Sequence, residues 1–399
     1  MILRPVISLF AVPALLLAAA LPCAAQSFDT GKVISDLWNE GFMNLRAAED
    51  SSSLVITLEN DTYKLQAEGF ARALDIIELQ TLPTNKPTEV VATKMGVPQV
   101  TMRYDPELGR WLTTSRVNDW DKVRRTRPVN STFGKVDIVL YPQVSIMNLI
   151  INQVYQSLWQ INPTLEVGLW RGAKFSYQIK VPLFNDGYGD GERIVHPSFL
   201  TLSQQFRDPW NLNVFGKLTV GTFSNSRFGA VVEAKYYFPD ERFSVDTQFG
   251  LLGLYYWQDF ILHYDRTLKF RWNVAGNFYW PEQKTQFTLR AQQFLLGEIG
   301  AKFEMIRHFR HCSIGFYAEK AYGAHTNGGF RFQIALPPYR FHRKGSLPRI
   351  TTSGQMGLVY NANNEQYYYK EFKTEASDNI MEANSFNPCY IASELKALR

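Results

Sequence analysis

The fold is decided by residues 287–336, which read FTLRAQQFLLGEIGAKFEMIRHFRHCSIGFYAEKAYGAHTNGGFRFQIAL. Apolar and polar residues alternate in four successive segments of this stretch, at 287–295, 299–305, 312–318 and 330–336. A period of two is typical of β-strands that have one apolar and one polar face. The breaks between the segments are short or rich in Gly and Asn, which predicts hairpins. The pattern alone leaves open which face is inside.

The same alternation extends back to residue 133, for example in the segment 173–181. We predict about 12–14 strands of about 9–13 residues, the length that a tilted membrane-spanning strand needs. Strands of soluble sandwiches are shorter, about five or six residues. Tight turns such as 208–209 alternate with longer loops such as 183–195, as in outer-membrane barrels. The predicted fold class is mainly β, an antiparallel transmembrane β-barrel with a small N-terminal α+β periplasmic domain.

The N-terminal part of the 399-residue chain has three predicted pieces. Residues 1–25 carry one basic residue, a Leu- and Ala-rich core and small residues before Gln26, which indicates a secretory signal peptide. A membrane anchor and a lipoprotein attached through Cys23 are the alternatives. Residues 26–110 mix helical and strand patterns and form the predicted periplasmic domain. Residues 111–132 are polar and charged and predict a linker, although their basic run could instead contact anionic headgroups or glycan.

The composition excludes few classes of protein. The formal net charge is +5, or +4 once Arg4 is removed with the signal peptide, and this is too small to indicate a nucleic-acid partner. The mean hydropathy of −0.21 suits a soluble protein, but it also suits a membrane barrel, whose alternating strands average out. Aromatic residues make up 14% of the chain and gather at predicted strand ends. Aromatic girdles at membrane interfaces and ordinary core aromatics both explain that position.

The polar phase of the predicted strands would line the lumen if the apolar phase faces lipid. It carries ten basic residues and four acids, which predicts a cation-lined interior suited to anionic cargo. Tyr237 and Tyr279 share this face and could stack on sugar rings. The alternative is a plugged, purely structural lumen held by pairs of basic and acidic side chains. The basic candidates are Lys174, Lys180, Lys217, Arg227, Lys235, Lys269, Arg271, Arg290, Lys302 and Arg331, and the acids are Glu233, Asp246, Glu304 and Glu319.

The sequence gives no indication of an enzyme. It has no G-x-S-x-G, H-E-x-x-H, P-loop or C-x-x-C motif. His308 and His311 are too few for a metal site. Residues 186–192 resemble part of a calcium loop, but the acid at its third position is missing, and Pro197 stands where the bidentate Glu should be. We predict no catalytic residue, no metal and no cofactor, with a Ser/His hydrolase in the barrel wall as the remaining alternative.

Several segments resemble the YjbH family of exopolysaccharide-biosynthesis outer-membrane proteins. They are RAQQFLLGEIGAKFEMIRHF at 290–309, CSIGFYA at 312–318 and NGGFRFQIALPP at 327–338, and the segments 180–186, 221–224 and 227–229 are similar to the family too. The likeness extends more weakly to the front domain, at 41–42 and 58–60. The resemblance implies a barrel in the outer membrane that assists export or surface assembly of an exopolysaccharide or capsule. The implied partners are outer-membrane lipid, an anionic polysaccharide and periplasmic or lipoprotein export partners. A general porin or structural barrel and a barrel-wall lipid or glycan hydrolase are the alternatives.

The C-terminus departs from the usual barrel pattern, because the chain does not end in an aromatic residue. We expect the barrel to cover residues 133–373, with Phe372 as the internal equivalent of that aromatic residue. Residues 374–399 then form a polar tail on the periplasmic side. Cys312 begins a strand at the same side, so we predict a disulfide between Cys312 and Cys389 that pins the tail.

Overall fold

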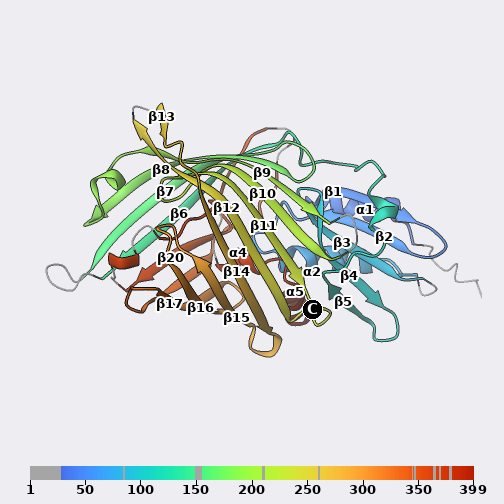
Figure 1. Cartoon of the computed structure of the whole chain (residues 1–399). Helices are drawn as coiled ribbons and strands as arrows, with labels where there is room; N and C mark the ends of the chain where they lie inside the picture. Colours follow the sequence, from blue (N-terminus) through green and yellow to red (C-terminus); the bar gives the residue numbers. More distant parts are fainter. Residues whose placement is uncertain are drawn as a thin grey trace, which may run out of the picture.

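The computed structural model describes residues 28–399, except for 84–85, 149–154, 209–211, 259–260, 344, 346, 363–364, 368–369 and 377–379. The predicted signal peptide, 1–25, lies outside these described residues. The chain forms a five-stranded sheet and a closed barrel of 13 strands, which confirms the mainly β fold with a small separate N-terminal sheet (Figure 1). No helix in the described part of the chain has both the length and the apolarity that crossing a membrane requires.

The N-terminal domain is a five-stranded sheet with helices on one face. Its strands are joined in sequence order, and only β2 and β3 run parallel, because α2 connects them. Asp29 caps α1 by accepting a hydrogen bond from the Lys32 amide, and Gly41 ends the helix in the left-handed conformation. The elements are α1 (Thr30–Glu40), β1 (Met43–Glu49), β2 (Leu54–Glu59), α2 (Gln66–Glu78), β3 (Thr88–Lys94), β4 (Val97–Asp105) and β5 (Arg110–Thr114).

The structure differs from the predicted linker at residues 111–132. This stretch includes most of β5 and a short helix, α3 (Trp120–Val123). Val123 is buried against Val55 and Val91, on the face of the sheet that α1 and α2 leave open. The few apolar side chains of this charged stretch therefore complete a second small core.

The barrel closes with one parallel seam. All neighbouring barrel strands pair antiparallel except β20 and β6, and an odd number of alternating strands requires this exception. The count lies within the predicted range of about 12–14 strands. The strands are β6 (Val136–Met147), β7 (Gln156–Gly168), β8 (Ala173–Asp186), β9 (His196–Arg207), β10 (Val214–Phe223), β11 (Arg227–Tyr237), β12 (Phe243–Gln258), β14 (Lys269–Trp280), β15 (Thr285–Gln293), β16 (Ile299–His308), β17 (Cys312–Ala321), β18 (Asn327–Ala335) and β20 (Gln355–Asn361).

Two further strands extend the barrel at its ends. β13 (Ile261–Tyr264) pairs with the end of β12, in a hairpin. β19 (Arg349–Thr352) pairs parallel with residues 137–140 of β6, and β20 pairs with residues 143–147 of the same strand. β19 and β20 therefore act as two pieces of one interrupted closing strand.

The barrel has its apolar phase outside and its polar phase inside. Leu289 and Phe316 are 62% and 52% exposed, whereas Lys302 on the other phase is 3% exposed. Thr288 and Ser313 are buried on the same inner face. Soluble proteins bury apolar side chains and expose polar ones, so this barrel has the reverse arrangement.

The C-terminal segment runs inside the barrel, not along its wall. The last barrel strand ends at Asn361, although the sequence predicts a barrel up to residue 373. β20 is already paired on both sides, so no free edge remains for another strand. Phe372 instead packs against Phe223 on the inner face of β10. The segment continues through α4 (Ile380–Ala383) to α5 (Pro388–Leu398), which lies beside the N-terminal domain (Figure 1).

Candidate functional site

The barrel lumen holds most of the predicted basic residues in ion pairs across neighbouring strands. Four pairs join a lysine to a carboxylate on the adjacent strand, the Lys180 pair reaches a connecting segment, and Arg331 on β18 reaches across β17 to Glu304 on β16. Among the acids of these pairs, the sequence analysis did not place Glu166 and Glu192 in the lumen. The pairs are Lys174–Glu166 at 3.7 Å, Lys180–Glu192 at 3.3 Å, Lys217–Glu233, Lys235–Asp246 at 3.6 Å, Lys302–Glu319 at 3.7 Å and Arg331–Glu304 at 3.4 Å.

Two carboxylates of the C-terminal segment join these pairs. Glu371 Oε2 lies 2.6 Å from Lys302 Nζ, and Gln292 Nε2 donates a hydrogen bond to Glu371 Oε1 at 2.9 Å. Glu375 lies 3.2 Å from Lys217 Nζ. The sequence analysis missed both acids because it placed residues after 373 outside the barrel and Glu371 in a strand. The excess of basic residues on the wall was the available signal, since buried charges need partners.

Four of the predicted cations, three arginines and Lys269, take part in no ion pair with the residues that the structure describes. Arg271 is buried and donates from Nε and Nη2 to the carbonyl oxygen of Leu295, at 3.3 and 2.8 Å. Arg227 and Arg290 each have a buried Nε without a hydrogen-bond partner. Lys269, the remaining candidate, is exposed at the start of β14. Among the described residues, the three arginines thus have no carboxylate within ion-pair distance.

The two predicted sugar-stacking tyrosines are buried by the protein itself. The ring centroids of Tyr237 and Phe215 lie 6.0 Å apart in an edge-to-face arrangement, and Lys235 Nζ lies 5.1 Å from the Tyr237 centroid. The ring centroids of Tyr279 and of Tyr390 in α5 lie 6.4 Å apart. In this state, neither ring is open to a glycan.

An apolar cluster contacts the C-terminal segment at the end of the barrel far from the N-terminal domain. Phe372 packs against the cluster of Phe223, Val231, Leu252 and Leu295. Next to it, Lys370 pairs with Glu298 at 2.8 Å. Phe372 thus attaches the C-terminal segment to this side of the wall, between the two carboxylate contacts.

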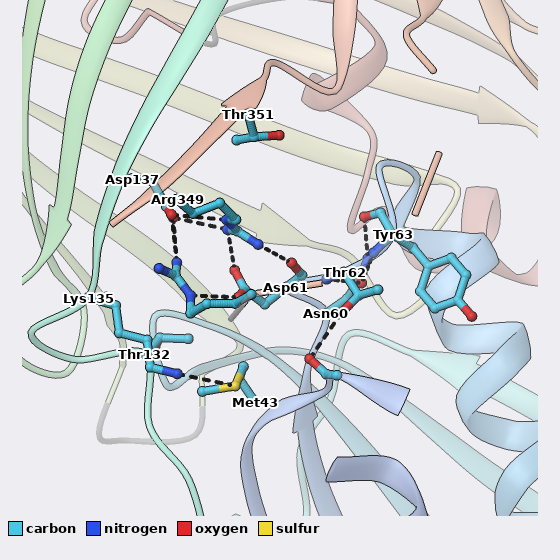
Figure 2. A network of polar contacts seen from close by, with 12 residues as sticks. Met43, Asn60, Asp61, Thr62, Tyr63, Thr132, Lys135, Asp137, Arg349 and Thr351 are labelled. Carbon is cyan, nitrogen blue, oxygen red and sulfur yellow. Dashed lines mark hydrogen bonds and ion pairs between the residues drawn. The ribbon is translucent and has the colours of Figure 1, made fainter. Parts of the chain in front are cut away.

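At the other end, a charged network ties the N-terminal domain to the barrel seam (Figure 2). Arg349 bridges Asp61 at 2.8 Å and Asp137 at 3.0 Å, and Arg343 bridges the same two carboxylates at 3.3 and 2.7 Å. Lys64 donates to Thr351 Oγ1 at 3.0 Å, and burial, with repulsion from Arg349, lowers the pKa of Lys64 to about 8. The loop that links β18 to β19 is therefore held against the domain, and the domain lies at the end with the tight turns.

The predicted disulfide is not formed, because Cys312 and Cys389 are both free thiols. Cys312 shares the outward phase of Phe316, whereas the C-terminal segment passes through the inside of the barrel. Cys389 lies in the first turn of α5, where burial, followed by the charges of Glu241 and Asp240, raises its pKa to about 12. Cys312 therefore lies on the outer face of the wall, whereas Cys389 lies in α5, near the β11–β12 turn.

A Ser–His–Asn arrangement, which the sequence analysis missed, bears on the hydrolase alternative. Ser313 Oγ is 2.8 Å from His308 Nδ1, and Asn384 Nδ2 is 2.9 Å from His308 Nε2. All three side chains are buried, and the Tyr390 ring covers His308 at 5.0 Å. A nucleophile must reach its substrate, so this arrangement joins α4 and α5 to the wall and gives no support to hydrolysis.

The comparisons with known proteins return nothing. No family model, curated protein or solved structure matches the chain. The likeness to the exopolysaccharide-biosynthesis family therefore stays a prediction from the sequence.

Proposed function

We propose that this protein is an outer-membrane β-barrel that assists export or surface assembly of an anionic exopolysaccharide. The observation that carries the membrane part is the reversed barrel, with its apolar side chains exposed and its polar side chains buried. Water outside such a barrel would contact a continuous apolar band, whereas lipid would match it.

The outer surface also carries an aromatic row, which supports this proposal. Phe243 and Phe278 are 5.1 Å apart, and the row continues to Phe287 and Phe303 at 6.3 and 6.4 Å. These rings cross β12, β14, β15 and β16 toward the end at which the N-terminal domain lies. Aromatic girdles are typical of both membrane interfaces of such barrels. The tight turns at this end favour a periplasmic position for the N-terminal domain.

The lumen supports the choice of an anionic cargo. Its wall has a basic excess, and three arginines remain outside the ion pairs described above. A polysaccharide with carboxylate groups would be attracted to such a wall. Residues 370–375, which lie inside the barrel and contact two sides of its wall, disfavour a permanently open general porin.

The first test is membrane fractionation with a heated and an unheated gel. We expect the protein in the outer-membrane fraction, with a mobility shift on heating. Deletion of the gene should then reduce the surface polysaccharide, and the wild-type gene should restore it. Recovery of a soluble periplasmic protein without a shift would contradict the membrane proposal.

A matched pair of variants tests the role of the lumen. The double variant Lys217→Gln/Lys302→Gln should restore less surface polysaccharide than the wild type. The control is Lys86→Gln/Lys122→Gln, which changes two lysines of the N-terminal domain, far from the lumen. If both double variants restore the same amount of surface polysaccharide and both show the normal gel shift on heating, a structural barrel is favoured instead.

A further inference from the structure

The segment 370–375 crosses the lumen from wall to wall. Glu371 contacts Lys302 on β16, and Glu375 contacts Lys217 on β10. These strands are five positions apart in a ring of 13, so they lie on nearly opposite sides. Between the two acids, Phe372 fills the apolar cluster on β10, β11 and β12. The segment therefore occupies part of the lumen with its own side chains.

The two lysines have a wall partner that does not depend on the segment. Lys302 pairs with Glu319 on β17, and Lys217 pairs with Glu233 on β11. Each site then holds one ammonium group and two carboxylates. Removal of Glu371 or Glu375 leaves a neutral pair on the wall, not an isolated buried charge, so it avoids the largest cost of breaking a buried ion pair.

The segment is attached firmly at its far end. Ile391 and Leu395 of α5 are buried in the core of the N-terminal domain, and Lys284 on the barrel pairs with Glu394 at 2.6 Å. The segment's main chain also bonds to the wall, at Ser224 and Leu295, and these bonds must break when the carboxylates leave. The chain then stays anchored at the periplasmic end through α5.

We propose that residues 370–375 are a displaceable plug, and that carboxylates of the exported polysaccharide replace Glu371 and Glu375 on Lys302 and Lys217. The proposal rests on the export function and names its substrate class, a glycan that contains uronic acids or similar carboxylate-bearing sugars. At the Lys302 site, the incoming carboxylate would accept from the ammonium group and from the Gln292 amide, as Glu371 does. A neutral glycan offers no such exchange.

Accessibility of a cysteine in the plug tests the exchange on the full-length protein in detergent. Thr374 is buried within the segment, so Thr374→Cys is a conservative reporter. Cys312 and Cys389 are replaced by Ser, and reaction with a maleimide is timed. Oligogalacturonate should accelerate labelling by about tenfold, as expected if it shifts the open fraction by that factor, and neutral maltooligosaccharides of the same length should not.

Substitutions of the plug acids give the second arm. Glu371→Gln/Glu375→Gln should speed labelling of Thr374→Cys without any oligosaccharide. The matched control is Glu192→Gln, which breaks a wall pair of similar geometry with Lys180 but leaves the plug unchanged. Thr101→Cys, buried in the N-terminal domain, reports general loosening.

Three results would overturn the plug proposal. The first is an unchanged labelling rate of Thr374→Cys, both with oligogalacturonate and in the double variant. The second is an equal acceleration of labelling by neutral oligosaccharides. The third is a faster labelling of Thr101→Cys together with that of Thr374→Cys. Failure of the export function is seen separately, as normal surface polysaccharide in the deletion strain. In that case the plug could still be displaced by carboxylates, but the barrel would have another cargo.

Discussion

Glu59 shows how one buried carboxyl couples the N-terminal domain to pH. It accepts hydrogen bonds from Asn44 Nδ2 at 2.7 Å and from the Gly96 amide at 2.9 Å. Burial is the larger effect and raises the pKa of Glu59, although these donors act in the opposite direction. The folded domain therefore keeps this proton to a higher pH than the unfolded chain. Where folded protein binds more protons, stability falls as pH rises.

We predict that Glu59→Gln removes this pH dependence. The amide oxygen can still accept from Asn44 and Gly96, and the variant has no proton to lose. As pH rises from 4.5, the ordinary value, through the raised pKa, the wild type should lose free energy of unfolding relative to the variant. The measurement is urea unfolding of the full-length protein in detergent, followed by tryptophan fluorescence. Exposed Glu107→Gln is the control, and parallel pH profiles for wild type and Glu59→Gln would refute the assignment.

At the scale of elements, the strands could be predicted and their partners could not. Alternation at residues 287–336 marks the strands, because a period of two is a local property. It is symmetric between the faces, so it left open which face is inside. Helix α5 was missed because its apolar positions pack on a core some 300 residues earlier in the chain, including Phe70 and Leu74. Asn387 and Pro388, a cap and a first-turn proline, were the local signals of this helix.

We predict that Ile391→Ala destabilises the N-terminal domain. Ile391 is fully buried in a core otherwise built from α1, α2 and the sheet, so its truncation leaves a cavity. The expected loss of free energy of unfolding is about 2–5 kcal/mol. The urea transition of the full-length protein measures it, with exposed Lys396→Ala on the same helix as the control. Equal stability of the two variants would mean that α5 is not part of this core.

At the scale of the whole molecule, the domain, the barrel and the plug form one connected unit. The Gly172 amide in the β7–β8 turn donates to the carbonyl of Met95 at 2.8 Å, and Ser115 donates to Glu241 in the β11–β12 turn. Together with the Arg343 and Arg349 network, these contacts hold the N-terminal domain against one rim. The plug joins the same domain through α5. The plug, residues 370–375, is therefore connected to the domain on its C-terminal side.

The outer band decides whether this unit belongs in a membrane. Leu289 lies at the middle of β15 and points outward, where a bilayer would surround it. In a bilayer, Leu289→Arg should reduce the free energy of unfolding by about 2–4 kcal/mol. The fraction of the protein that folds into lipid vesicles should fall accordingly. The heat-dependent gel shift measures that fraction. Leu79→Arg, at an exposed position after α2, adds the same charge outside the barrel and should fold as the wild type does. If both variants fold equally well into vesicles, lipid does not contact β15, and the apolar band must be covered in another way.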